Sequence, residues 1–135
     1  MHYKAVLSQT DVQRILAAAC AEAQSQGWAV AIAVVDDGGH PLALTRLDGC
    51  APIGGYVATE KARSAALGRR ETKVYEDMVN GGRTAFLGAP CLTPLEGGVP
   101  IIVENQVIGA VGVSGVKSDQ DAQVARIGIA VLKGM

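Results

Sequence analysis

Arg46 and Asp48 are the pair of charged residues that most strongly suggests a binding site in this sequence. They lie in the segment RLDGCAP, residues 46–52, directly after a predicted strand. Loops at strand ends often carry binding and catalytic groups. The planar guanidinium of Arg46 is suited to binding a carboxylate. The two residues also fit a plain structural ion pair, and the sequence leaves both interpretations open.

Lys61 is a second candidate, because it lies among small apolar residues on a predicted helix. The neighbours on its face, at helical spacings, are Ala58, Ala62 and Ala65. Its amine therefore either reaches solvent or points into a cavity. In a cavity its pKa would fall, and the amine could act as a base or form a Schiff base. Asp36 or Asp48 would then be the proton partner.

His40 and Cys20 are two further candidates, and each also has a plain structural explanation. His40 lies in the turn DDGGHP, residues 36–41, where Asp36 can also serve only to accept backbone N–H groups. His40 in such a turn is expected to be exposed. Cys20 lies on the apolar stripe of the first predicted helix, where a cysteine commonly acts as a small buried hydrophobic residue.

The hydrophobic pattern predicts helix, two strands, two helices, two or three strands, and a final helix. Ser8 or Thr10 caps the first helix, which ends near Gly27. The other predicted helices are Tyr56–Leu67, Lys73–Val79 and Ser118 to about Lys133. The predicted strands are Trp28–Asp36, Leu42–Leu47, Val99–Glu104 and Gln106–Ser114, with an optional short strand at Cys91–Leu95.

The segment from Val99 to Gly115 is predicted to form a central hairpin. Its two β-branched runs are separated only by ENQ, residues 104–106, and Asn105 suits a tight turn. Glycines at 109, 112 and 115 indicate a bulge, or the close approach of a helix or ligand. Hairpins imply an antiparallel sheet, and helices at both ends of the chain can cover it, so the fold class is α+β.

Length and composition indicate one domain, residues 1–135. The chain is 49% hydrophobic but only 4% aromatic, so the core must consist mainly of small aliphatic side chains. Because each buries little area, self-association into a homo-oligomer is expected. A net charge of −1 without a basic patch argues against nucleic acid as a partner. No apolar run long enough to span a membrane and no signal-peptide pattern are found, so a cytoplasmic protein is expected.

Several enzyme classes lack their motifs. The glycines from Gly109 to Gly115 do not form G-x-G-x-x-G and lie within a strand, so a dinucleotide site is not predicted. The sequence GVSG, residues 112–115, falls one residue short of a hydrolase elbow. The two histidines and three cysteines show no metal-ligand spacing, so no metal site is predicted.

Six short segments of this sequence, taken in order, resemble those of the GlcG/HbpS family, which includes the C-terminal domain of PduO-type adenosyltransferases. The segments are VVDxxG at 34–39, RLDG at 46–49, EKAxxAA at 60–66, GGxPI at 97–101, VIGAVGVSG at 107–115, and Asp121 with Val124-Ala125. The resemblance covers roughly residues 12–130. It implies a profilin-like α+β fold, a five-stranded antiparallel sheet flanked by helices, and tetramers, hexamers or octamers. It also implies a small-ligand site at a subunit interface; members are described as haem or tetrapyrrole binders, and some degrade haem.

Two departures from the family pattern disfavour haem here. The first helix of haem-binding PduO-type domains resembles a pattern with a histidine, whereas this helix reads LAAAC, residues 16–20. Cys20 could replace that histidine as a thiolate ligand if it faces a pocket. The iron-binding E-x-x-E pattern of HbpS-like members is also missing, because this region carries Glu71 and Glu76-Asp77.

The sequence therefore leaves three alternative functions open. The first is a carboxylate-binding pocket that gathers Asp36, Arg46, Asp48, Lys61, Ser114 and Gly115, with cofactor-free chemistry on a small oxo- or hydroxy-acid. The second is a haem-binding oligomer with His40, Cys20 or an interface residue as axial ligand. The third is an assembly module in which Arg46, Asp48 and Lys61 form a buried ion-pair network.

Overall fold

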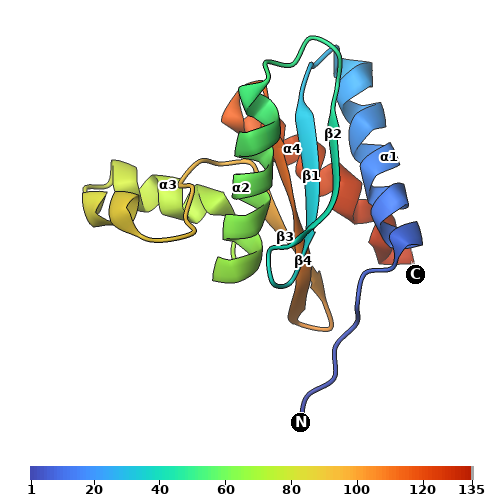
Figure 1. Ribbon diagram of the computed structural model, residues 1–135, viewed down its shortest axis with the longest axis horizontal. Helices are drawn as coiled ribbons and strands as arrows, with labels where there is room; N and C mark the ends of the chain where they lie inside the picture. Colours follow the sequence, from blue (N-terminus) through green and yellow to red (C-terminus); the bar gives the residue numbers. More distant parts are fainter. Residues whose placement is uncertain (135) are drawn as a thin grey trace.

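A four-stranded antiparallel sheet with helices on both faces makes up the body of the protein (Figure 1). The computed structural model describes residues 1–134. The strands lie in the order β2-β1-β4-β3. The helices are α1 (Gln9–Gln26), α2 (Ile53–Gly68), α3 (Thr72–Asn80) and α4 (Ser118–Ala130), with short 3-10 helices η1 (Thr84–Gly88) and η2 (Val131–Gly134). The strands are β1 (Ala31–Asp36), β2 (Pro41–Arg46), β3 (Gly98–Val103) and β4 (Gln106–Ser114).

The predicted α+β class is confirmed, but the five-stranded sheet is wrong, because residues 1–134 form four strands. The optional strand at Cys91–Leu95 does not form. The Ser64 hydroxyl lies 3.3 Å from the carbonyl oxygen of Cys91 and 2.8 Å from the amide nitrogen of Thr93. Ser64 of α2 therefore binds backbone groups of this segment that would otherwise pair with a neighbouring strand. The profilin-like assignment stays a prediction.

β1 is apolar from Ala31 to Val35 because helices cover both of its faces. Side chains alternate across a strand, so successive residues enter different cores. Val30, Ile32 and Val34 pack in the core beneath α1 and α4, whereas Ala31, Ala33 and Val35 pack against α2. Figure 1 shows α1 and α2 on opposite sides of the sheet, and α4 packs against α1 and β4.

The predicted hairpin forms between β3 and β4. Glu104 and Asn105 both have positive φ, 52° and 62°, as a two-residue type I′ turn requires. The register shifts between Ile101 and Ile102, which marks an irregularity of the kind that the glycines indicate. β4 is a central strand, while β3 lies at the edge of the sheet.

Local signals fix the ends of α1 as the sequence predicts. Ser8 and Asp11 form a capping box, and Gly27 ends the helix with φ 74°. The direction of α1 places its C-terminus beside the start of β1. Among residues 1–134 no helix is both long and apolar enough to cross a membrane.

Candidate functional site

Strand pairing brings the ends of β2 and β4 together beside the start of β1. Ala31 pairs with Arg46 on one side and with Ser114 on the other. Asp48 and Gly115 continue directly from these strands. The structure therefore gathers four of the predicted site residues, Arg46, Asp48, Ser114 and Gly115, at what we call the Arg46 end of the sheet.

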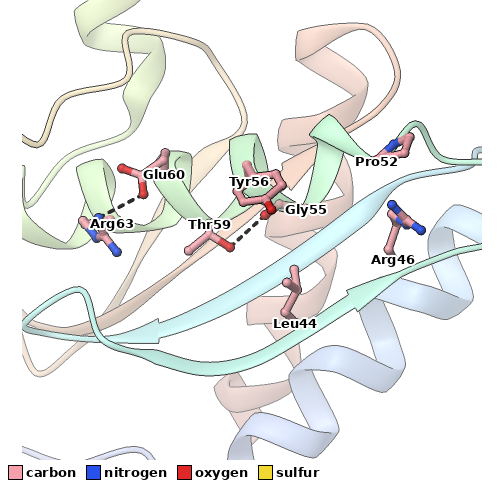
Figure 2. Close-up of a pocket in the computed structure, with 8 residues that line it drawn as sticks. All are labelled: Leu44, Arg46, Pro52, Gly55, Tyr56, Thr59, Glu60 and Arg63. Atoms are coloured by element: carbon pink, nitrogen blue, oxygen red, sulfur yellow. Dashed lines mark hydrogen bonds and ion pairs between the residues drawn. The ribbon is translucent and has the colours of Figure 1, made fainter.

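The first hollow at this end, the Tyr56 groove, lies between β2 and the first turns of α2 (Figure 2). Its volume is about 550 Å³, within the range typical of ligand sites. Arg63 is paired with Glu60 at 2.9 Å, and Thr59 donates to the Gly55 carbonyl, whereas no hydrogen bond or ion pair joins Arg46 to the other residues drawn (Figure 2). The lining residues are Leu44, Arg46, Pro52, Gly55, Tyr56, Thr59, Glu60 and Arg63.

The second hollow, the Trp28 hollow, also has Arg46 in its wall. It encloses about 380 Å³ between the C-terminus of α1 and the segment after β2. Its lining residues are Gln24, Gly27, Trp28, Ala29, Arg46, Leu47 and Asp48. In the described part of the chain, neither Arg46 nor Asp48 forms an ion pair or a hydrogen bond through its side chain. The Arg46–Asp48 ion pair, one of the two interpretations that the sequence leaves open, is thus not formed: both side chains are exposed, so hydration competes with pairing.

A third hollow of about 360 Å³, the Cys50 hollow, contains Ser114, Gly115 and Cys50. The Cys50 Sγ lies 3.9 Å from the carbonyl oxygen of Ser114 and 3.5 Å from that of Ala51. Burial raises the pKa of the Cys50 thiol, and the positive charge of Arg46 only partly opposes this shift. Cys50 is therefore a neutral thiol at physiological pH.

Lys61 is enclosed and already paired, so it neither reaches solvent nor enters one of these hollows. Only 3% of its surface is exposed. Its Nζ donates to the carbonyl oxygen of Val113 at 2.9 Å and to the Oδ2 of Asp121 at 3.1 Å. The expected pairing with Asp36 or Asp48 is wrong, because α2 packs against β4 and the amine of Lys61 meets Asp121 at the start of α4.

Asp121 completes this buried pair from the first turn of α4. Its Oδ1 accepts a hydrogen bond from the Val116 amide at 3.2 Å, and 2% of the residue is exposed. Burial raises the pKa of Asp121 above its ordinary value, while Lys61 and the Val116 amide oppose the shift. The pair holds both ends of the segment from Val113 to Val116, which includes Ser114 and Gly115.

Asp36 and His40 lie at the opposite end of β1 from Arg46, about 16 Å away along the strand. The Oδ1 of Asp36 accepts from the amides of Gly38 and His40, each at 2.9 Å, and lies 3.2 Å from the His40 Nδ1. Asp36 therefore closes the turn, the structural alternative for this residue. The predicted single pocket containing Asp36, Lys61 and Arg46 is not formed.

Cys20 is half-buried and packs against the core beneath α1. Burial raises the pKa of its thiol. It borders none of the three hollows at the Arg46 end. The described residues contain no group of three or more His, Cys, Asp or Glu side chains that could hold a metal ion.

The sequence prediction missed three residues. Tyr56 and Trp28 line hollows at the Arg46 end, and Asp121 is the partner of Lys61. Tyr56 lies one helical turn after Pro52, and this spacing could have identified the wall of the groove. Trp28 directly follows the glycine that ends α1. Asp121 is 60 residues from Lys61, and no local pattern connects the two.

Similarity to known proteins identifies the family to which the chain belongs. A family model described as haem degrading protein HbpS-like matches residues 7–130. The chain belongs to the HbpS-like family. This HbpS-like chain is 64% identical to protein GlcG of Escherichia coli strain K12 over 114 residues, which are 84% of this chain and 85% of GlcG.

Solved structures extend the likeness over nearly the whole HbpS-like chain. A double mutant of HbpS from Streptomyces reticuli matches with a TM-score of 0.89 and 29% identity, covering 98% of this chain and 90% of that one. The PduOC:haem complex matches with a TM-score of 0.85 and 25% identity, covering 93% and 94% of the two chains. The predicted resemblance to the GlcG/HbpS family is therefore confirmed.

Proposed function

We propose that this HbpS-like protein binds a small carboxylate-bearing ligand through Arg46. The supporting observation is that Arg46 is exposed, has no ion pair within residues 1–134, and lines two hollows at once. A guanidinium binds a carboxylate through two parallel N–H···O bonds, which fixes the orientation of the ligand. The neighbouring apolar residues Leu44, Trp28 and Leu47 supply contacts for the rest of the ligand.

Replacing Arg46 by alanine is expected to weaken carboxylate binding about 10- to 100-fold, because hydrogen bonds to charged groups contribute about 1.5–3 kcal/mol. Isothermal titration calorimetry with a series of small carboxylic acids measures the change. Arg126→Ala is the matched control, since Arg126 is paired with Glu71 away from these hollows. Equal affinity of the Arg46→Ala variant and the original protein would reject the proposal.

Catalysis on an oxo- or hydroxy-acid would have to use groups at the Arg46 end. Lys61 is not available as a base or a Schiff-base nucleophile while its amine is enclosed and bonded to Asp121 and Val113. Asp48 is the acid–base group nearest to Arg46 in sequence that also lines a hollow with it. The arrangement therefore supports binding more directly than it supports a reaction.

Haem binding is the second candidate, favoured by the likeness to the haem complex of PduOC. The Tyr56 groove fits part of what haem requires, since apolar walls lie beside a cation that could bind a propionate. Among its lining residues only Tyr56 has a side chain of the kind that ligates haem iron. His40 and Cys20, the ligands expected from the sequence, do not line this groove.

A haemin titration followed by absorption spectroscopy tests this candidate. Saturation at a fixed stoichiometry with a sharp Soret band is expected if haem occupies the groove. Tyr56→Phe should then shift the band, since the phenol oxygen is lost while the ring remains. Broad, non-saturable binding, or a spectrum that Tyr56→Phe leaves unchanged, would contradict haem ligation at this position.

The expected homo-oligomer stays a prediction, and exposed apolar side chains beside the groove support it. Ile53 is 67% exposed and Tyr56 is 78% exposed, and both lie on the first turns of α2. Leu44 on β2, which is 53% exposed, lines the groove together with Tyr56. Burial of such side chains against another copy would remove apolar area from water and deepen the groove.

A further inference from the structure

We propose that the Trp28 hollow selects a ligand that carries an ammonium group beside its carboxylate, as an amino acid does. This inference rests on the proposed carboxylate site at Arg46 and names the class of ligand for it. Two independent observations support it: the charges of Arg46 and Asp48 in the wall of the hollow, which have no ion-pair partner among the described residues, and the direction of α1. Both features lie at the Trp28 hollow.

The first observation is the presence of two opposite charges in one wall. Arg46 and Asp48 are separated by one residue, both line the hollow, and they do not pair with each other. A ligand with a single carboxylate would satisfy Arg46 but would place a second negative charge near Asp48, which is unfavourable. A zwitterion satisfies both groups, with its carboxylate on Arg46 and its ammonium on Asp48.

The second observation is the C-terminus of α1 at the edge of the hollow. Gln24 and Gly27, from the last turn and the cap of this 18-residue helix, line the hollow. The carbonyl end of a helix carries partial negative charge and favours a cation nearby. The last turn of α1 contains no basic side chain. A ligand ammonium would therefore supply the positive charge that this helix end lacks.

The remaining wall is suited to an aliphatic side chain. Trp28, Ala29 and Leu47 contribute apolar surface, and the hollow encloses about 380 Å³. This volume lies toward the small end of ligand sites, so it suits a molecule of amino-acid size better than a macrocycle. The Tyr56 groove, by contrast, is lined by the paired charges of Glu60 and Arg63 and not by Asp48.

Four matched compounds test the inference: leucine, 2-hydroxy-4-methylpentanoate, 4-methylpentanoate and 3-methylbutylamine. They share the aliphatic part and differ only in the two charged or polar groups. Trp28 is the sole tryptophan and lines both this hollow and the Cys50 hollow, so a fluorescence change that depends on Arg46 reports occupancy of this hollow, and calorimetry gives the stoichiometry. Leucine is expected to bind most tightly, about tenfold better than 4-methylpentanoate.

Two variants separate this inference from the proposed function. Asp48→Asn should reduce leucine affinity about tenfold and should not weaken 4-methylpentanoate binding, because the variant removes the negative charge that repels a lone carboxylate. Arg46→Ala should weaken the binding of all three carboxylates. Asp77→Asn on α3 is the control for loss of one negative charge. Equal binding of the three carboxylates, all dependent on Arg46, would overturn the amino-acid preference but keep the carboxylate site. Absence of Arg46-dependent binding for every compound would overturn both.

Discussion

Replacing Lys61 by methionine is expected to lower the free energy of unfolding by about 3–5 kcal/mol, a large part of the stability of a domain this size. The substitution keeps a long apolar stem but leaves the carboxylate of Asp121 buried without its counter-ion. Asp121 is 2% exposed and accepts one further hydrogen bond, from Val116. The Val113 carbonyl also loses a donor. Urea denaturation followed by circular dichroism measures the loss.

Two further variants show whether the loss comes from the unpaired charge. Lys73→Met removes an exposed ion pair with Asp77 and should cost less than about 1 kcal/mol. The double variant Lys61→Met/Asp121→Leu should recover much of the stability, because it removes both charges from the interior. A Lys61→Met protein as stable as the original would contradict a structural ion pair and would reopen a functional role for the amine.

The pH dependence of the Lys61→Met variant follows from the carboxyl that remains. Burial already raises the pKa of Asp121, and loss of Lys61 removes a group that opposes this shift. A carboxyl whose folded pKa lies above its unfolded pKa binds protons more tightly in the folded state. Its stabilising contribution is full below the unfolded pKa and is lost as pH rises through the folded pKa. The variant's deficit should therefore be smaller near about pH 5 than near about pH 8.

Replacing Gly112 by alanine is expected to lower the free energy of unfolding by at least about 3 kcal/mol. A Cβ atom at this position would lie 2.0 Å from the carbonyl oxygen of Ala58 and 2.5 Å from the amide nitrogen of Ala62. Both are backbone atoms of α2, which cannot move aside as a flexible side chain can. Gly98, the partner of Gly112 across β3 and β4, makes a similar approach to the Lys61 carbonyl. The glycines at this place allow α2 to lie against the sheet.

Gly55→Ala is the matched control for the glycine substitution. The nearest atom to a Cβ at Gly55 is the Leu44 Cδ2 at 3.8 Å, an ordinary contact. Because alanine favours a helix over glycine, this variant should be unchanged or up to about 1 kcal/mol more stable. The comparison uses the same denaturation measurement. A Gly112→Ala protein within about 1 kcal/mol of the original would show that the helix can move away from the sheet without large cost.

Local sequence determined the elements and much of the packing. Ser8, Asp11 and Gly27 set the ends of α1 through capping contacts made within a few residues. The apolar run of β1 required cover on both faces. The density of glycine in β4 indicated a bulge or the close approach of a helix or ligand, and α2 is the helix that lies there. These features follow from backbone preferences and side-chain size, which act over short distances along the chain.

The tertiary structure alone decided which charged groups meet. Lys61 was identified from its apolar surroundings, but its partner Asp121 lies 60 residues away and was not predicted. Asp36 and Arg46 are close in sequence and share a hairpin, yet the antiparallel course of β1 and β2 places them at opposite ends of the sheet. Helical and strand periodicity specify the face on which a residue lies. Which contacts that face makes depends on how distant elements pack. Within residues 1–134, this packing enclosed Lys61 and left Arg46 without an ion pair, between two hollows.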